Sequence, residues 1–171
     1  MKETQKKLIW WWGWNPDPLE SELEEQAKRG WVIDQVDPLC IWIRFRKGTP
    51  QQRRFATDYQ PEASKDYLEI FQADGWHLEW TGANGWYLFS KAYTDERPEI
   101  FTDNASLIEK NNRILKVLLP LFIMLIVLFI TIVLPILKEP FYVGLYVFAL
   151  GLYTYIFTQV WLHNRKLKID I

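Results

Sequence analysis

The stretch VLLPLFIMLIVLFITIVLPIL, residues 117–137, contains no charged residue. A helix rises about 1.5 Å per residue, so this stretch would extend about 32 Å and match the roughly 30 Å hydrocarbon core of a bilayer. Lys138-Glu139-Pro140 interrupts it, and residues 141–162, FYVGLYVFALGLYTYIFTQVWL, are again uncharged and of similar length. In lipid, backbone N–H and C=O groups must form their hydrogen bonds within each segment, which favours helices. The short connection between the two segments makes these helices antiparallel. The sequence therefore predicts a two-helix transmembrane hairpin.

Basic residues flank the two predicted spans on the same side. They are Lys110, Arg113 and Lys116 before the first span and Arg165, Lys166 and Lys168 after the second. Because cytoplasmic flanks carry the excess of Lys and Arg, we expect both termini to be cytoplasmic, with a short tail over residues 163–171. The segment Leu8–Trp14 is too short to be the apolar region of a signal peptide and contains Gly13. The prediction is a multi-pass protein of the cell membrane.

The remaining residues are enough for one soluble domain. The chain carries 20 Lys and Arg against 21 Asp and Glu, a net charge of −1, which argues against nucleic acid as a partner. One cysteine, Cys40, cannot form an intramolecular disulfide, and with His77 and His163 it does not make a metal-ligand set. No phosphate-binding loop or nucleophile motif is present, so we expect neither an enzyme nor a cofactor.

The soluble region contains an internal repeat. Gly30-Trp31 recurs as Gly75-Trp76, and the same offset of 45 residues holds without a gap through both copies. The matching pairs include Pro16 and Pro61, Leu23 and Leu68, Glu24 and Glu69, Ile33 and Leu78, Asp34 and Glu79, Trp42 and Tyr87, and Ile43 and Leu88. We therefore predict a duplicated domain over residues 1–98, with repeats at about 6–50 and 51–95.

Each repeat has the pattern strand, helix, strand, strand. Runs of β-favouring residues and turn signals predict strands at 7–14, 31–36, 39–47, 53–59, 76–81 and 86–92, with a turn at 82–85. Helices are expected from Asp17, with Asp17 and Glu20 as a cap, to Gly30, and over 65–74. The fold class is α+β: a tandem β-α-β-β repeat with an antiparallel sheet and two covering helices, followed by the transmembrane hairpin. A linker helix in 99–116, capped by Thr102 or Asp103, should run into the first span as a stiff connection.

Strand periodicity assigns side chains to the two faces of the sheet. The face expected under both helices carries Leu8, Trp10, Trp12, Trp14, Trp31, Ile33, Ile41, Ile43, Phe45, Phe55, Tyr59, Trp76, Leu78, Trp86 and Leu88. The opposite face carries Trp11, Asp34, Trp42, Arg44, Arg46, Arg54, Asp58, His77, Glu79, Tyr87, Phe89 and Lys91. This second face mixes aromatic rings with both signs of charge.

The open face is the candidate site. Its ligand or partner residues would be Trp11, Asp34, Trp42, Arg44, His77, Glu79, Tyr87 and Phe89. Rings beside a carboxylate can hold an organic cation, at about 0.5–2 kcal/mol per ring. The same residues can instead form a protein or dimer interface, or fill the groove between the repeats. Asp34 and Glu79, equivalent in the repeat, are expected either to approach each other or to pair with basic residues of neighbouring strands.

Two glycines of the second span, Gly144 and Gly151, are seven residues apart and therefore share one helix face. Small residues allow close helix approach, so they are candidates for packing against the first span or against another protein. No ionisable residue lies in the middle of either predicted span, which argues against an ion pathway within one copy.

Several motifs resemble an uncharacterised membrane family of Gram-positive bacteria, classified only as a domain of unknown function. They are the Gly-Trp pairs after both predicted helices, the segment 44–48 (RFRKG), Asp58-Tyr59 and the segment 99–103 (EIFTD). The resemblance covers about residues 15–116. Members of that family are often encoded beside PadR-type transcriptional repressors, which implies a regulatory setting without a defined chemistry or catalytic residues. The triple tryptophan at 10–12 is not part of this pattern.

A second resemblance is one of architecture and involves no sequence motif. Tandem strand-helix-strand-strand units resemble gyrase-inhibitor-like multidrug-sensing domains, which implies a cleft between the units for lipophilic cations beside a glutamate.

The leading functional hypothesis is a membrane-anchored cytoplasmic sensor or regulatory module. It would bind a protein, such as a transcriptional regulator or transporter, or an apolar or cationic small molecule through its open sheet face. Membrane lipid and a second copy of the chain are further expected partners. The alternative is an accessory or assembly subunit of a membrane complex, recognised through its spans.

Overall fold

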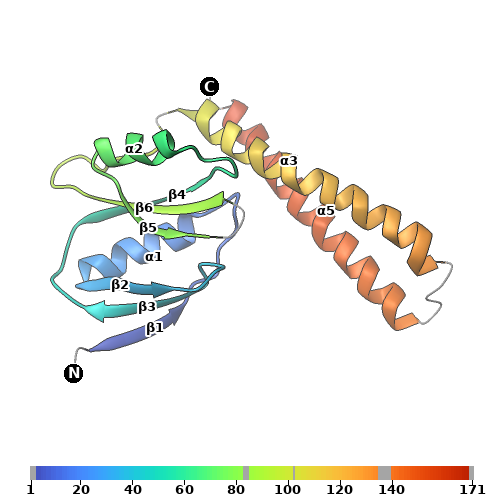
Figure 1. Cartoon of the computed structure of the whole chain (residues 1–171), viewed down its shortest axis with the longest axis horizontal. Coiled ribbons are helices and arrows are strands. Elements are labelled where there is room, and N and C mark those ends of the chain that lie inside the picture. Colours follow the sequence, from blue (N-terminus) through green and yellow to red (C-terminus); the bar gives the residue numbers. More distant parts are fainter. Residues whose placement is uncertain (1–2, 83–84, 102, 135–139, 170–171) are drawn as a thin grey trace. The chain divides into compact units, whose positions relative to one another are not determined.

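The computed structural model describes residues 3–82, 85–101, 103–134 and 140–169. The chain divides into two compact units, Met1–Thr102 and Asp103–Ile171. The first unit is an α+β domain, and the second is a pair of long helices (Figure 1). The expected turn at 82–85 and the end of the first span, including Pro135, fall partly or wholly outside the described residues.

The first unit contains the two predicted repeats. Their elements are β1 (Thr4–Leu8), α1 (Asp17–Lys28), β2 (Trp31–Val36) and β3 (Trp42–Lys47), followed by β4 (Arg53–Tyr59), α2 (Lys65–Ala73), β5 (His77–Thr81) and β6 (Trp86–Ala92). They form two antiparallel three-stranded sheets with equivalent strand orders, β1-β3-β2 and β4-β6-β5. Each sheet has a register shift at the same repeat position, next to Asp34 in β2 and Glu79 in β5. The predicted α+β tandem repeat is confirmed.

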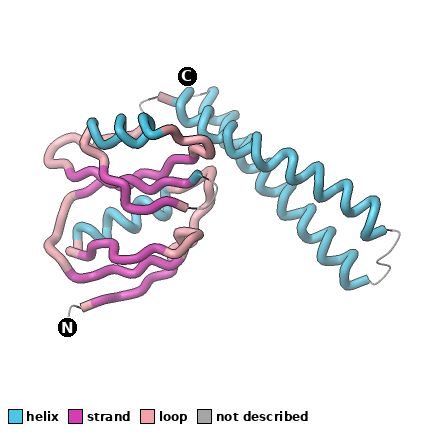
Figure 2. The backbone as a smooth tube through the Cα atoms, viewed as in Figure 1, coloured by secondary structure: helices cyan, strands magenta, loops and turns pink. Residues whose placement is uncertain are grey.

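The two helices do not cover one common face, and that expectation is wrong. α1 lies between the two three-stranded sheets, which Figure 2 shows as separate groups of strands. Leu19, Leu23 and Ala27 of α1 pack in one core with Ile43 and Phe45 of the first sheet, and this core continues to Phe55 and Leu88 of the second. Every one of these side chains is buried. The first helix therefore supplies apolar surface to both repeats, which joins them into one domain.

α2 covers the other face of the second sheet. Its half-buried Tyr67, Leu68 and Phe71 pack against the buried residues Ala56, Trp76 and Phe89. Tyr67, Leu68 and Phe71 therefore point towards the second sheet. Since Phe55 and Leu88 already face α1, both faces of the second sheet are covered by helices. β4 is accordingly buried along nearly its whole length, including Arg54 and Asp58, which were expected on an open face.

The first strand begins and ends earlier than predicted. β1 stops at Leu8, before the tryptophans, so the alternation expected over 7–14 is wrong. Lys7 faces α1 and donates to Glu22 at 2.5 Å, whereas Leu8 pairs with Trp42 on the outer face. Leu8 and Trp10, expected in the core, are 50% and 56% exposed. The contact between Lys7 and Glu22 fixes which side chains of this edge strand face α1. The apolar pattern of the sequence did not indicate this register.

The expected side-chain cap of the first helix is also wrong. Pro16 occupies the N-cap position of α1 without a capping hydrogen bond, and Glu20 is buried against β4 instead. The glycine terminators are as predicted: Gly30 and Gly75 adopt φ of 79° and 81°, and the next strand follows each directly.

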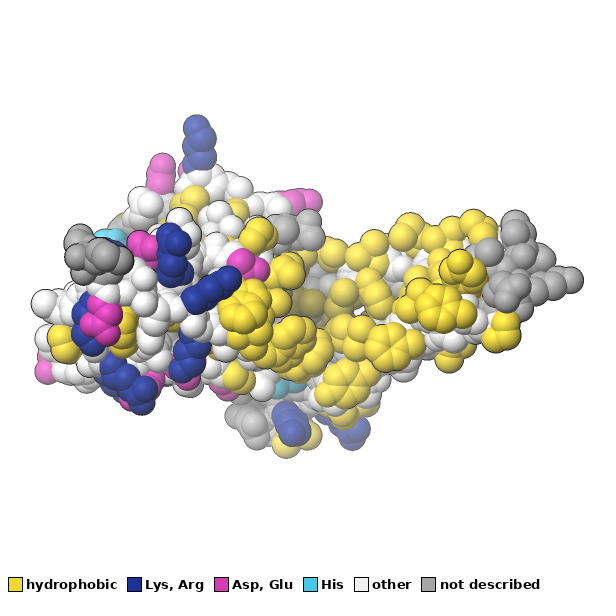
Figure 3. All heavy atoms as spheres, turned by 90° about the horizontal axis from the view of Figure 1, so that it is seen from below, with side chains coloured by type: hydrophobic (Ala, Val, Ile, Leu, Met, Phe, Trp, Pro, Cys, Tyr) yellow, Lys and Arg dark blue, Asp and Glu magenta, His cyan; other side chains and the backbone are white. Residues whose placement is uncertain are grey.

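The second unit is a helical hairpin. Its first arm is α3 (Asn104–Leu128), continued by a π-helical turn at Phe129–Val133, and its second arm is α5 (Pro140–Ile169). Asp103 caps α3 by accepting a hydrogen bond from the Ser106 amide at 2.7 Å, and α3 runs without a break from the linker into the first predicted span. Both arms are long and apolar enough to cross a membrane. The hairpin is predominantly hydrophobic on the face seen in Figure 3.

Polar side chains join the two arms near the chain ends of the hairpin. Asn111 donates to Asn164 at 2.8 Å, and Asn164 donates to Asn112 at 3.1 Å. Gly144 and Gly151 behave differently: a Cβ built on either one meets no described atom within 4 Å. The expectation that they pack against the first span is therefore wrong, and packing against another protein stays a prediction.

Cys40 provides a test of this fold. Its thiol is fully buried, and burial raises its pKa to about 12, with the Asp37 carboxylate adding to the effect. We expect no reaction with a thiol-specific disulfide reagent at pH 8 in the native chain, because roughly one thiol in 10⁴ would be ionised at this pH. Reaction should appear only in urea. Stoichiometric labelling of the native chain within minutes would contradict the placement of Cys40 in the core.

Candidate functional site

The predicted open face is divided between three environments. Asp34, Trp42 and Arg44 remain together on the outer face of the first sheet, where Arg44 donates to Asp34 at 2.8 Å. The Lys6 ammonium lies 4.7 Å from the Trp42 ring centre, and Trp42 is 45% exposed. These residues make a small surface with aromatic and basic groups. Figure 3 likewise shows hydrophobic side chains beside Lys and Arg on this unit.

Tyr87 and Phe89 are not available on a surface face. Phe89 is 1% exposed and stacks on Phe71 of α2, with ring centres 4.5 Å apart. Tyr87 packs beside it against Tyr67. Tyr67 in turn donates its hydroxyl to the buried Asp58 at 2.8 Å. The predicted membership of Tyr87 and Phe89 in a ligand cage on the open face is wrong, since α2 covers these rings.

Trp11 and Glu79 point into the domain rather than out of it. Trp11 donates its indole N–H to the Cys40 carbonyl at 3.0 Å and packs edge-on against Trp86. Glu79 lies at the register shift of β5 and accepts hydrogen bonds from Arg53 and Ser90. It does not pair with Asp34, whose partner is Arg44 on another face. His77 is exposed at the start of β5.

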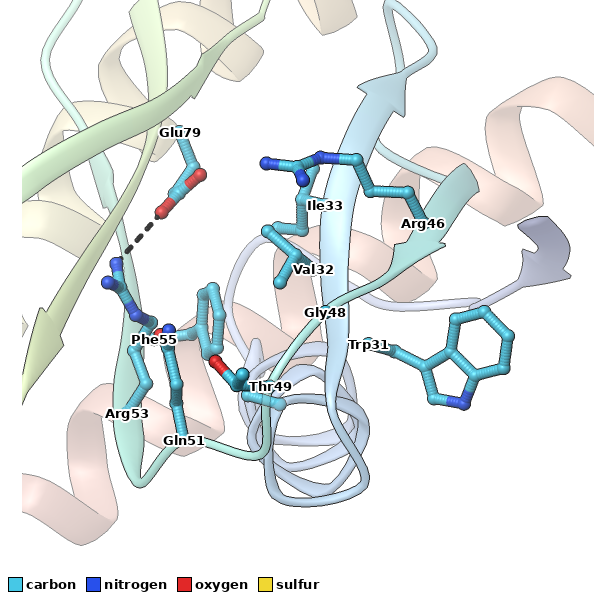
Figure 4. A pocket seen from close by; sticks show the side chains of 11 residues that line it. Trp31, Val32, Ile33, Arg46, Gly48, Thr49, Gln51, Arg53, Phe55 and Glu79 are labelled. Carbon is cyan, nitrogen blue, oxygen red and sulfur yellow. Dashed lines mark hydrogen bonds and ion pairs between the residues drawn. The ribbon is translucent and has the colours of Figure 1, made fainter. Parts of the chain in front are cut away.

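A cavity of about 360 Å³ lies between the two repeats (Figure 4). The second sheet contributes Arg53, Phe55 and Glu79. The first repeat contributes Ala27 of α1, Trp31, Val32 and Ile33 of the edge strand β2, Arg46 of β3, and the following segment Gly48, Thr49 and Gln51. The volume is within the range of small-molecule sites. Sequence reasoning identified Glu79 and Arg46 as exposed-face residues but gave no signal that they share a cavity with Arg53 and Phe55.

Polar and apolar groups are separated within this cavity. Figure 4 shows Arg53 and Glu79 joined on one side, with Arg46 extending over Ile33 towards them and Trp31 pointing away. Arg53 donates to Glu79 at 3.2 Å and to the Ser90 hydroxyl at 2.6 Å. Phe55 and Ala27 are buried and form part of the apolar wall. The arrangement suits a ligand with a polar head and an apolar body.

A buried ionic cluster lies directly beside the cavity. Arg54, the neighbour of Arg53, donates to Glu20 and Glu24 of α1 at 2.7 and 3.2 Å, and to Glu99 at 2.7 Å. Arg97 pairs with Glu24 at 2.9 Å and also with Glu99. Burial by itself lowers the pKa of Arg54, but the carboxylates of Glu20 and Glu99 outweigh it and raise that pKa above its ordinary value. Arg54 thus stays charged throughout the neutral pH range.

The sequence did not indicate this cluster, because Glu20 was expected to cap the first helix and Glu24 lies off the apolar face of Leu19, Leu23 and Ala27. Glu20 also accepts hydrogen bonds from the amide and hydroxyl of Thr57 in β4, at 2.8 and 2.9 Å. β4 is an edge strand, so this buried carboxylate occupies a place where a neighbouring strand would otherwise pair. No local sequence signal separates such a glutamate from a surface one.

The chain is thus a duplicated α+β domain with a cavity between its repeats, followed by a helical hairpin with two candidate membrane spans. Residues 15–123 match the family described as Protein of unknown function (DUF2812), and the chain belongs to that family. The match begins just before α1 and extends into α3. Searches of curated proteins and of solved structures give no significant match.

The ionic cluster predicts a large loss of stability on replacement of Arg54 by alanine. This change leaves Glu20 buried without its cation and leaves Glu24 with Arg97 alone. Breaking a buried ion pair in this way costs about 3–5 kcal/mol in comparable cases. Arg29→Ala removes an exposed arginine from its pair with Glu25 and should cost less than about 1 kcal/mol. Urea unfolding of the full chain in detergent, followed through Cys40 labelling, measures both. Equal midpoints for the two variants would show that the cluster does not stabilise the domain.

Proposed function

We propose that this protein is a membrane-anchored regulatory module that senses a small molecule in the cavity between its two repeats. The observation that carries the proposal is the cavity itself, because both repeats line it and it combines an apolar wall with three charged side chains. A ligand held there contacts both sheets at once. Its binding would stabilise one relative arrangement of the repeats, which is the basic requirement for a sensor.

The residues next to the cavity could transmit ligand binding to the segment that leads into the hairpin. Arg53 lines the cavity, and the adjacent Arg54 holds Glu99 at 2.7 Å. Glu99 precedes Asp103, the cap of α3, by four residues. A ligand that binds Arg53 would shift β4 and with it the Arg54–Glu99 contact. In this proposal the segment leading into the hairpin therefore responds to occupancy of the cavity.

Filling the cavity tests the proposal. Val32→Phe adds a ring to the cavity wall, whereas Leu39→Phe makes a similar change at an exposed loop residue. We expect the wild-type chain and Leu39→Phe to be stabilised by at least one member of a panel of small acids, amines and neutral molecules. A ligand at 100 times its Kd should add about 2.7 kcal/mol to the unfolding free energy.

Val32→Phe should lose this stabilisation while keeping Cys40 protected from labelling. Thermal unfolding of the full chain in detergent gives the comparison. If every ligand that stabilises the wild type stabilises Val32→Phe equally, the cavity is not the binding site and the proposal fails.

Two candidate spans support association with a membrane, and we propose that the duplicated domain lies on the cytoplasmic side. The basis is the group of basic residues at the chain ends of the hairpin, including Lys116 and Arg165. Cysteines introduced separately at Asp95 and Lys138 test this orientation in intact cells. A membrane-impermeant maleimide should label Lys138→Cys and spare Asp95→Cys until the cells are opened. The reverse pattern would put the domain outside.

An accessory subunit of a membrane complex is the second candidate function. It is favoured by the open surroundings of Gly144 and Gly151 in the hairpin and by the exposed Trp42. Exchange of the hairpin for an unrelated one separates the two functions. Ligand binding by the cavity should survive this exchange, whereas recognition through the spans should not.

A further inference from the structure

We infer that the cavity between the repeats selects a small organic anion, such as a carboxylate on an aromatic or aliphatic body, and not a lipophilic cation. This inference rests on the proposed function, because it assigns a ligand class to the same cavity. It departs from the expectation of a cation cage, whose rings the fold distributes elsewhere. Three features of the lining residues carry it: their charge, their unsatisfied donors and their apolar wall.

The charge of the lining favours an anion. Its charged residues are Arg46, Arg53 and Glu79, so the cations outnumber the single carboxylate. Glu79 is already engaged, since it accepts hydrogen bonds from both Arg53 and Ser90. A cationic ligand would therefore meet two guanidinium groups and a carboxylate whose charge is compensated. An anion would instead meet an excess of positive charge.

The hydrogen-bonding groups that remain are donors. The Nε of Arg53 is buried and has no hydrogen-bond partner among the described residues. Buried donors of this kind are rare and costly, so an unpaired one beside a cavity indicates where an acceptor from a ligand would lie. In the described part of the chain, the Arg46 guanidinium also makes no ion pair or hydrogen bond. Figure 4 shows it extending over Ile33 towards the Arg53 side of the cavity.

A carboxylate matches these donors geometrically. It accepts two hydrogen bonds side by side, and a guanidinium offers N–H groups in a planar fork. Arg53 donates through Nη1 to Glu79 and Ser90, and its buried Nε has no partner among the described residues, so a small shift of this side chain would present the Nε edge to the ligand. Arg46 can add a second, more exposed contact. The ligand head would thus be held between one arginine from each repeat, which links the anion to the arrangement of both sheets.

The apolar wall sets the size of the ligand body. Ala27 and Phe55 are buried, and Val32 and Ile33 line the side formed by β2. A volume of about 360 Å³ accommodates a one-ring or two-ring aromatic acid or a medium-length acyl chain. Inorganic anions would leave this wall unfilled and bind weakly. The predicted ligand is therefore amphipathic, with its charge at one end.

The test compares two probes of the same shape and opposite charge. The full chain in lipid nanodiscs is titrated calorimetrically with 2-naphthoate and with 2-naphthylmethylammonium at pH 7, and empty nanodiscs provide the blank. We expect 2-naphthoate to bind at least tenfold more tightly than the ammonium probe. Arg53→Gln should weaken naphthoate binding tenfold or more, and Arg46→Gln several-fold. Arg29→Gln changes an exposed arginine just after the end of α1 and outside the cavity, and it should leave binding unchanged.

Protection of Cys40 from labelling establishes that each variant is folded. If Arg53→Gln does not fold, Arg46→Gln still gives a decisive test. Equal or tighter binding of the ammonium probe, or naphthoate binding that neither arginine variant weakens, overturns the inference. If naphthoate fails while only cationic or neutral molecules bind, and their binding is lost in Val32→Phe, the anion is wrong and the proposed function stands. If Val32→Phe changes no binding at all, both are wrong.

Discussion

The duplicated domain depends on the buried contact between Glu20 of α1 and β4. One oxygen of this carboxylate accepts from the Thr57 amide and hydroxyl, and the other accepts from Arg54. A buried backbone N–H at a sheet edge is costly unless it finds an acceptor, and a buried carboxylate is costly unless it is paired. Each group satisfies the other, and the result fixes a helix of the first repeat on a strand of the second.

This contact explains why the two repeats, although alike in topology, pack differently. With α1 against Phe55 and Leu88, that face of the second sheet is already covered, and α2 packs on the opposite face. The rings of Phe89 and Tyr87 pack into the core beneath α2. The two repeats thus have equivalent strand orders and equivalent register shifts. They differ in their helices, because α1 packs between both sheets whereas α2 packs on the second sheet alone. The cavity lies where the edge strand β2 approaches the second sheet without pairing to it.

The cavity and the ionic cluster are linked by consecutive residues of one strand. Arg53 faces the cavity and Arg54 reaches the carboxylates of α1 and Glu99, because successive side chains of a strand leave it on opposite sides. One arginine is thus stabilised by carboxylates, while the other keeps a buried donor free. In the proposed function, stability and ligand recognition thus depend on neighbouring residues with separate partners. The hairpin is held by different chemistry, with the amides of Asn111 and Asn164 joining two arms that are otherwise apolar.

The sequence by itself determined the repeat, the order of strands and helices, the glycines that end α1 and α2, and the two long apolar helices. These features depend on local rules: helical and strand periodicity, the freedom of glycine at positive φ, and the length needed to cross a bilayer. Only the tertiary structure decided which face each helix covers, the register of β1, and the partners of Glu20, Arg53 and Glu79. These outcomes depend on contacts between residues distant in the chain, such as Glu20 with Thr57 and Lys7 with Glu22. A glutamate or an arginine has the same local pattern whether it meets water or a buried partner, so its role is set by what the rest of the fold brings to it.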